Sequence, residues 1–330
     1  MKAESARVLW RMSSTFESAG QRSHWALDEA LKSLLGFRST AKQAIMDTFW
    51  NWWQHIPERL DPVIFQIGGF KLQYYGLMYV IAFVITYVLV LYRIKREERF
   101  DVSSDQVQAL VTYMMLGVIA GGRFGYVLFY NLSYYLEHPL EIILPFEFSN
   151  GIKFTGITGM SYHGGLICVI LFAWLYSRKA RLNFLEMTDL FIPAIPLGYT
   201  FGRLGNFING ELYGRVASVP FGMYFPQAPG LQMRHPSQLY EAFFEGLFLF
   251  GVLWALRKTI QTRGAMLALY LIGYGSVRFF IEYFRQPDDH LGFILLSFSM
   301  GQILCMCMIA GGISLYGYFL HKEKTSGATG

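Results

Sequence analysis

Charged residues are scarce in this chain of 330 residues. Asp, Glu, Lys and Arg together make up 15% of it, whereas soluble domains usually contain about 25%. Hydrophobic residues make up 53%, and the mean hydropathy is +0.32. This shortage of charge indicates that lipid surrounds much of the chain. The net charge of +5 is spread over short connecting segments, which argues against nucleic acid as a partner.

Cysteine and paired histidine are also sparse. The three cysteines, Cys168, Cys305 and Cys307, lie inside apolar runs, so no disulfide framework is visible. None of the seven histidines forms a pair at ligand spacing, and we predict no metal site. The N-terminal residues contain no apolar core followed by small residues, so we expect no cleavable signal peptide.

Long apolar runs are what the sequence has in quantity. A run of about 20 apolar residues is needed to cross a hydrocarbon core. Seven candidates cover approximately residues 72–92, 107–130, 160–177, 186–205, 238–256, 264–283 and 293–319. The sequence therefore predicts an all-α polytopic membrane protein with about seven transmembrane helices. The fourth run is the least regular, because Pro193, Pro196 and Arg203 interrupt it.

Lysine and arginine are distributed unevenly over the connections between these runs. The connections after the first, third, fifth and seventh runs carry twelve of them, and the opposite connections carry four. Basic connections are retained in the cytoplasm. We therefore expect the start of the first span to be extracytoplasmic and residues 321–330 to form a cytoplasmic tail.

Residues 1–57 do not fit this scheme, because they hold seven Lys and Arg on the opposite side. The aromatic stretch over residues 48–55, TFWNWWQH, is typical of a membrane interface. One interpretation is an amphipathic helix that lies on the membrane. The other, which we favour, is a variable extension without a role in the chemistry.

Two connections on the predicted outer side are unusually long, over residues 131–158 and 206–236. Connections of this length are usually functional or disordered. Aromatic residues in the second, among them Phe221, Tyr224 and Phe225, favour packed structure. We expect the two connections to form a small extracytoplasmic cap.

Arginines inside the apolar runs are informative, because each costs about 2.5–3.5 kcal/mol in a membrane. Arg123, Arg203 and Arg278 each lie in the outer half of a run that leads outward. At 1.5 Å of rise per residue, all three lie at a similar depth. Each could instead extend its charge to the interface. Together they suit an anionic phospholipid, because a guanidinium matches a phosphodiester well.

Several other polar side chains accompany these arginines. Glu282 lies one helical turn after Arg278 and can form an ion pair that orients its guanidinium toward a ligand. Glu241 and Glu245 share a face of the fifth run, and we expect them to counter the arginines in a structural role. His163 begins the third run, where an imidazole with an ordinary pKa of about 6.5 is suited to general-base catalysis or to a structural hydrogen bond.

The segment Gly202–Gly214, GRLGNFINGELYG, resembles the signature of the bacterial prolipoprotein diacylglyceryl transferases. The supporting matches are DPVIF at 61–65, YGLMY at 75–79, SYHGG at 161–165, RHPSQLYE at 234–241 and FRQPD at 284–288. The resemblance covers about residues 58–320 as one catalytic membrane domain. It says nothing about the N-terminal extension.

The resemblance implies a reaction and a location. The family transfers the diacylglyceryl group of phosphatidylglycerol to the thiol of a lipobox cysteine in a prolipoprotein. It forms a thioether and releases glycerol 1-phosphate, with no metal or nucleotide cofactor. Its members span the bacterial cytoplasmic (inner) membrane seven times, with the N-terminus outside.

The resemblance also implies roles for individual residues. Arg203 is expected to bind the headgroup, Arg278 to meet the charge that develops on the phosphate, and His163 to activate the thiol. Tyr75 is expected to be catalytic together with His163 and Arg278, and four further matches are expected to position the substrates: Asn206, Glu211, Gly214 and Glu282. From their place in the sequence alone, Arg123 and Asn209 are expected to contribute to substrate binding. A lipid transporter is the main alternative, although transporters often have symmetric halves with broken helices. A membrane scaffold whose charges pair with one another is the third.

Overall fold

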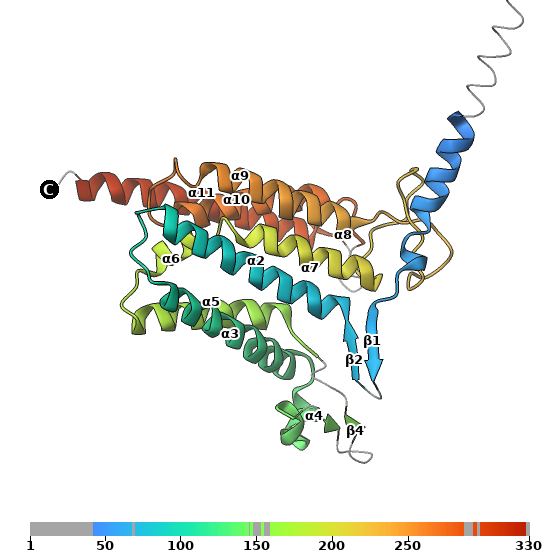
Figure 1. The fold of residues 1–330 in the computed structure, drawn as a ribbon, viewed down its shortest axis with the longest axis horizontal. Helices are drawn as coiled ribbons and strands as arrows, with labels where there is room; N and C mark the ends of the chain where they lie inside the picture. The colour runs from blue at the N-terminus through green and yellow to red at the C-terminus, as the bar shows by residue number, and fades with distance from the viewer. Residues whose placement is uncertain are drawn as a thin grey trace, which may run out of the picture.

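Long apolar helices dominate the structure, a computed structural model that describes residues 42–67, 70–144, 146–147, 153–154, 159–286, 293–295 and 298–327 (Figure 1). The helices are α2 (Tyr74–Arg96), α3 (Ser104–Tyr130), α5 (Tyr162–Lys179), α6 (Phe184–Phe191), α7 (Ile195–Asn209), α8 (Ser237–Tyr240), α9 (Leu249–Leu256), α10 (Ala265–Ile281) and α11 (Met300–Gly327). A π-helix, η3 (Glu241–Phe248), joins α8 to α9.

Four helices in the described part of the chain are long and apolar enough to cross a membrane. They are Tyr74–Arg96, Ser104–Tyr130, the combined helix Ser237–Leu256, and Met300–Thr325. The helix α10 is apolar but shorter. This mostly helical architecture is consistent with a polytopic membrane protein, as predicted. The number of seven spans stays a prediction.

The structure departs from the predicted spans in two places. The fourth run is two helices, since α6 ends at Phe191 and α7 begins at Ile195. Proline lacks an amide hydrogen and clashes with the preceding turn, so Pro193 and Pro196 fit a break and a helix start. The last run begins with a hairpin of β5 (Phe293–Leu295) and β6 (Phe298–Ser299), and α11 starts only at Met300. Because α11 continues to Gly327, much of the predicted tail is helical.

Close helix pairs build the bundle: α3 with α5, α10 with α11, and α2 with α7. Small residues bring α3 and α5 together, because a Cβ at Gly117 would lie 2.8 Å from the carbonyl oxygen of Cys168. Gly121 and Gly125 repeat this spacing along α3 and face Gly164. Small residues four apart are typical of helix pairs in membranes, where backbones must approach closely to pack.

Most of the shorter elements lie at one end of the bundle, and the C-terminus lies at the other (Figure 1). They are η1 (Pro57–Arg59), the hairpin of β1 (Val63–Ile67) and β2 (Phe70–Gln73), α4 (Leu132–Glu137), η2 (Pro139–Ile142), β3 (Phe146–Glu147) and β4 (Lys153–Phe154). The connection over residues 210–236 lies at the same end. It is packed as predicted, since Met223 and Phe225 are buried against Phe207 and Trp53. A cap shared with residues 131–158 stays a prediction, because part of that connection lies outside the described residues.

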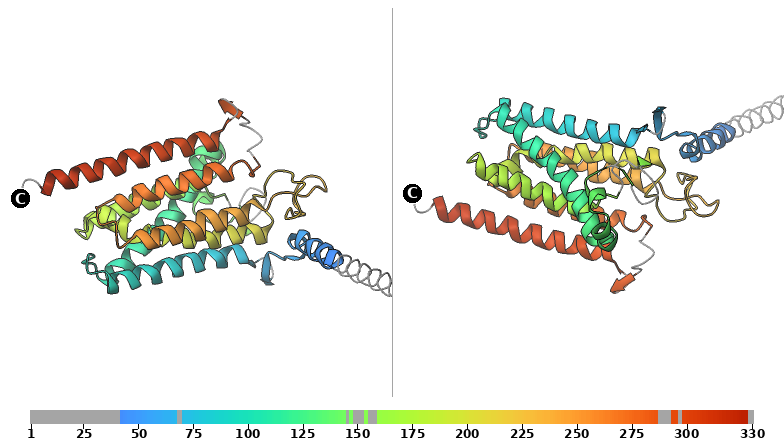
Figure 2. Two further views of the ribbon diagram at one scale, coloured as in Figure 1. Left: turned by 90° about the horizontal axis from the view of Figure 1, so that it is seen from above. Right: turned by 90° about the horizontal axis from the view of Figure 1, so that it is seen from below.

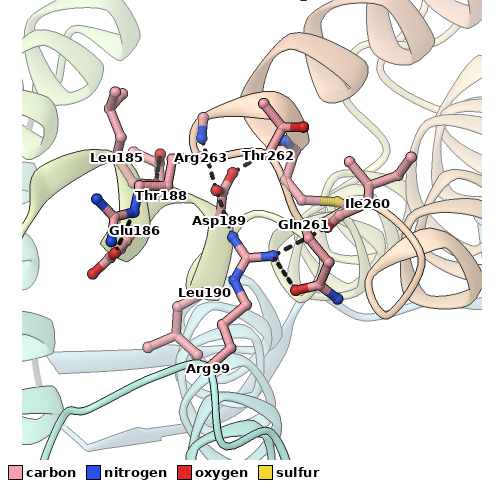
Figure 3. Close-up of polar contacts among 12 residues, drawn as sticks. Arg99, Leu185, Glu186, Thr188, Asp189, Leu190, Ile260, Gln261, Thr262 and Arg263 are labelled. Atoms are coloured by element: carbon pink, nitrogen blue, oxygen red, sulfur yellow. Dashed lines mark hydrogen bonds and ion pairs between the residues drawn. The ribbon is translucent and has the colours of Figure 1, made fainter. Parts of the chain in front are cut away.

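A buried aspartate, Asp189, links several elements at the opposite end. Asp189 of α6 is fully buried, and its Oδ2 accepts hydrogen bonds from Arg99 at 2.8 Å and from the backbone of Gly264 at 2.7 Å (Figure 3). Its Oδ1 accepts from the backbone of Met266, in the first turn of α10. A carboxylate is favourable at a helix N-terminus. Arg93 of α2 also donates to the Asp189 carbonyl, at 2.7 Å.

Replacing Asp189 with alanine is expected to destabilise the protein by about 3–5 kcal/mol, because Arg99 and two backbone amides lose a buried partner. Thermal unfolding in detergent should show a clear fall in Tm. Glu186→Ala is the matched control, because Glu186 lies on the same helix as Asp189. Its partner, Arg263, has a side chain that is 68% exposed. That substitution should cost no more than about 1 kcal/mol. Equal losses in the two variants would contradict this account of Asp189.

Candidate active site

Arg203 lies in the second half of α7, and its side chain is only 16% exposed. Its Nε lies 2.8 Å from Oε2 of Glu241 and donates to the hydroxyl of Tyr199 at 2.6 Å. Its Nη1 donates to Oδ1 of Asn206 at 3.2 Å. The guanidinium is therefore held by groups on its own helix and on η3. The hydrogen bonds and the ion pair described for this side chain use Nε and Nη1.

Arg278 lies near the end of α10, and its side chain is 14% exposed. Its Nη1 is 3.4 Å from both Glu241 and Glu245, and its Nη2 is 3.2 Å from Oε2 of Glu282. The last contact is the predicted pairing one helical turn apart. Ser299 donates to the other oxygen of Glu282 at 3.2 Å, which fixes that carboxylate.

Glu241 brings the two arginines together. One oxygen of this fully buried carboxylate, Oε2, contacts both Arg203 and Arg278. The other oxygen lies 3.4 Å from Arg285. Glu241 and Glu245 both belong to the π-helix, a form that is rare and frequent at functional sites. The two arginines therefore belong to one cluster, as the sequence predicted, and the two carboxylates counter them.

The connection after α7 continues the cluster. Asn206 donates from Nδ2 to Oε1 of Glu211 at 2.7 Å, and Gln238 donates to the Glu211 carbonyl at 2.6 Å. The helix ends at Gly210, whose positive φ of 69° suits glycine. Arg203, Asn206 and Glu211 thus form a chain of hydrogen bonds that leads from α7 into the connection.

Gly214 lies where three backbone segments meet. Its amide donates to the carbonyl of His235 at 2.8 Å, and it pairs with Arg285 in an isolated bridge. A Cβ at this position would strike the carbonyl oxygen of Phe284 and lie 2.8 Å from that of His235. Gly214 is therefore required for close backbone approach. Burial lowers the pKa of His235, so this imidazole is neutral near pH 7.

Tyr75 lies beside the cluster at the start of α2. Its hydroxyl is 3.0 Å from that of Tyr79, one turn further along. A Cβ at Gly205 would lie 3.0 Å from the ring of Tyr75, so this ring packs on α7 next to Asn206. The structure therefore places Tyr75 against α7 two residues after Arg203, and its part in the reaction stays a prediction.

His163 lies in the first turn of α5, where Ser161 caps the helix through the amide of Gly164. The imidazole is exposed and lies next to the ring of Tyr162, with 5.6 Å between the ring centroids. The described contacts of the imidazole do not include a residue of the arginine cluster, and the role of His163 stays a prediction.

Two predicted residues have other surroundings. Arg123 of α3 donates to the carbonyls of Glu141 and Ile142 in η2 and lies over the ring of Tyr135, 4.9 Å from its centroid. The described contacts thus direct it to the segment after α3. The backbone of Asn209 accepts from Gln227 at 2.8 Å, and its buried Oδ1 has no hydrogen-bond partner among the described residues. A part in substrate binding stays a prediction for both residues.

Two members of the cluster, Tyr199 and Arg285, were not among the predicted site residues. Tyr199 precedes Arg203 by one turn of α7 and also bonds Glu245 at 2.5 Å. The spacing of four residues was visible in the sequence and predicts a shared helix face. Arg285 follows Arg278 by two turns, but its approach to Glu241 depends on the backbone pairing with Gly214. That contact had no local signal.

The arrangement suits the binding of an anion in a membrane. Arg203, Arg278 and Arg285 converge on one carboxylate at one end of an apolar bundle, with their side chains mostly buried. Low exposure strengthens charge-assisted hydrogen bonds to a ligand that replaces water. Fold and site together are consistent with a polytopic membrane protein that holds a cluster of largely buried arginines and carboxylates at one end of its helix bundle.

Comparison with known proteins identifies the family. The prolipoprotein diacylglyceryl transferase family matches residues 62–318. The chain is 55% identical over 271 residues to the phosphatidylglycerol–prolipoprotein diacylglyceryl transferase of Chlorobaculum tepidum, which covers 82% of this chain and 93% of the relative. It is 46% identical over 258 residues to the enzyme of the same name from Bordetella avium. This alignment covers 78% of this chain and 94% of the relative. The chain therefore belongs to the prolipoprotein diacylglyceryl transferase family, which confirms the resemblance seen in the motifs.

Proposed function

We propose that this chain transfers the diacylglyceryl group of phosphatidylglycerol to the thiol of the lipobox cysteine of a prolipoprotein. The products are a thioether and glycerol 1-phosphate, and the reaction is the first step of bacterial lipoprotein maturation. Relatives named for this activity cover most of the chain at high identity. The observation that carries the proposal in the structure is the contact of Arg203 and Arg278 with one oxygen of Glu241.

The reaction forms one bond and breaks one. The cysteine thiol gives its proton to a base, and the sulfur attacks the carbon of the diacylglyceryl group that carries the phosphate. The carbon–oxygen bond breaks, and its electron pair leaves with glycerol 1-phosphate. The barrier falls when fixed cations meet the negative charge that grows on the phosphate and when the thiol is deprotonated.

Arg203 and Arg278 supply the fixed cations in this proposal. Their carboxylate partners already hold them within the bundle, so little reorganisation is needed when charge develops on the leaving phosphate. We assign Arg203 to the lipid headgroup and Arg278 to the leaving phosphate. Glu241 keeps the two guanidinium groups at a fixed separation.

The remaining predicted residues have supporting roles. His163 takes the thiol proton. Seven others bind or orient the two substrates: Tyr75, Arg123, Asn206, Asn209, Glu211, Gly214 and Glu282. The hydrogen bond from Asn206 to Glu211 supports this, because it links the arginine helix to the outer connection.

The proposed setting is the bacterial inner membrane, crossed seven times. Residues 58–320 form the catalytic membrane domain, with the arginine cluster near the extracytoplasmic face. The C-terminus is cytoplasmic, and this orientation rests on basic residues at the ends of α2 and α5, such as Lys95 and Arg178.

The direct test uses purified protein, phosphatidylglycerol and a lipobox peptide. Glycerol 1-phosphate and a peptide heavier by one diacylglyceryl group should appear in equal amounts. A peptide whose cysteine is replaced by serine should give neither product. Movement of lipid between leaflets without a covalent product would instead favour a transporter.

Replacing His163 with glutamine is expected to lower turnover more at pH 7 than at pH 9. A free cysteine thiol has a pKa of about 8.5, so at alkaline pH it ionises without a base. The ratio of wild-type to variant turnover should therefore fall as pH rises through that range. The pH profile of kcat with the lipobox peptide measures this ratio. An equal loss at both pH values would exclude the base role.

A further inference from the structure

The helix over residues 42–54 lies outside the part of the chain that matches the family, which begins at residue 62. It has the pattern of an amphipathic helix. Apolar side chains recur at Ile45, Phe49 and Trp52, which share a face at a spacing of four and three residues. Asp47 and Asn51 lie on the opposite face. The helix therefore carries an apolar strip along one side, and Trp50 lies outside this strip, toward Asp47.

The end of this helix is docked on the connection over residues 210–236. Trp53 donates from Nε1 to the carbonyl of Phe221 at 3.1 Å, and Gln54 donates to that of Pro220 at 3.0 Å. The amide of Tyr224 donates back to the carbonyl of Gln54 at 2.8 Å. The ring of Trp53 also packs on the buried cluster of Phe207, Met223 and Phe225. These contacts fix the helix to the site end of the bundle.

Beyond this docked end, no part of the chain that the structure describes covers the apolar face of the helix. Ile45 is 69% exposed, Phe49 45% and Trp52 48%. The nearby hairpin carries two more exposed apolar side chains, Phe65 and Ile67. Both Figure 1 and Figure 2 show the helix projecting beyond the bundle at the end where the connection after α7 lies.

We propose that this helix is a membrane-interface anchor, whose apolar face lies in the leaflet next to the arginine cluster. Tryptophan and phenylalanine suit the headgroup region, and the polar face of Asp47 and Asn51 then faces water. Lys42, on the apolar side at the start of the helix, can extend to lipid phosphates. A lipid surface fits better than a protein partner, because the helix is docked at one end of a bundle whose helices are long and apolar enough to cross a membrane.

The anchor has a consequence for the site. The docked segment Pro220–Tyr224 includes Met223, which pairs with Arg234 in a backbone bridge. The residue after Arg234 is His235, whose carbonyl accepts a hydrogen bond from the amide of Gly214. The membrane surface is thereby linked to the connection that carries Glu211 and Gly214, and the anchor fixes the height of this connection above the lipid.

The test places a nitroxide spin label on either face of the helix. A chain with Cys168, Cys305 and Cys307 replaced by alanine carries a single cysteine, either Phe49→Cys or, as the matched control, Asp47→Cys. Both are reconstituted in nanodiscs containing phosphatidylglycerol. Collision with oxygen reports lipid, and collision with a water-soluble nickel chelate reports water. The ratio of oxygen to nickel accessibility should be several-fold higher at position 49 than at 47.

Three outcomes would overturn the proposal: equal ratios, nickel access at position 49, or dipolar broadening that shows two copies in contact through this face.

A second measurement needs no cysteine-free chain. Brominated lipids should quench the fluorescence of Trp52, so Trp52→Phe should remove a quenched component. Trp53→Phe is its control, because Trp53 packs on protein. Quenching that survives Trp52→Phe unchanged would also contradict the proposal.

Discussion

Replacing Arg203 with alanine is expected to lower the rate of diacylglyceryl transfer by about 10²–10³-fold, the loss typical of removing one preorganised donor at a developing charge. The guanidinium donates hydrogen bonds to Tyr199 and Asn206 and forms an ion pair with Glu241, so its removal leaves this buried carboxylate with one cation fewer. Arg278 and Arg285 still contact Glu241, and we expect the fold to be retained. Initial rates with phosphatidylglycerol and a lipobox peptide, together with Tm, measure both effects.

The matched control is Arg263→Ala. Arg263 is 68% exposed at the opposite end of the bundle, where it pairs with Glu186. Its loss should leave both the rate and Tm close to those of the wild type. A rate near that of the wild type in Arg203→Ala would remove the proposed role in binding the headgroup. A collapse of Tm in that variant would make Arg203 a structural residue.

Replacing Gly214 with alanine is expected to abolish most activity for a steric reason. The new Cβ would meet the carbonyl of Phe284 and the backbone of His235, so the backbone must move. Because neither neighbour is a flexible side chain end, the connection that carries Glu211 shifts with it. We expect kcat/KM for the lipobox peptide to fall by about 10²-fold, as small misplacements of positioning groups typically cause.

Gly251→Ala is the control for this substitution. Gly251 lies in α9, and a Cβ there meets nothing within 4 Å. Alanine is also favoured over glycine in a helix, so stability should stay the same or rise slightly. If Gly214→Ala retained wild-type kcat/KM, the close approach of the three backbone segments would have no bearing on catalysis.

The apolar runs and the arginines could be predicted from the sequence alone, because both follow from simple physical costs. A charge in a membrane is expensive, so Arg203 and Arg278 had to have partners. Their distances from the starts of their apolar runs predicted a similar depth for both. In the structure both contact the same oxygen of Glu241. The pairing of Arg278 with Glu282 followed from helical periodicity.

Other features depend on contacts between distant segments. The docking of Trp53 on Phe221 joins residues that are 168 positions apart. Nothing in the sequence of residues 1–57 indicated this contact. The π-helix that carries Glu241 and Glu245 has no sequence rule of its own. Arg123 lay at the predicted depth, but its described contacts are with η2, since depth alone does not fix the direction of a side chain.

The central claim is that Arg203 and Arg278 bind one phosphodiester. An experimentally determined structure of the protein with phosphatidylglycerol bound tests it most directly. We expect phosphate oxygens within about 3 Å of both guanidinium groups, the usual length of a charge-assisted hydrogen bond. A phosphate held at Arg123 instead, or by one of the two arginines with the other still paired only to carboxylates, would contradict the account.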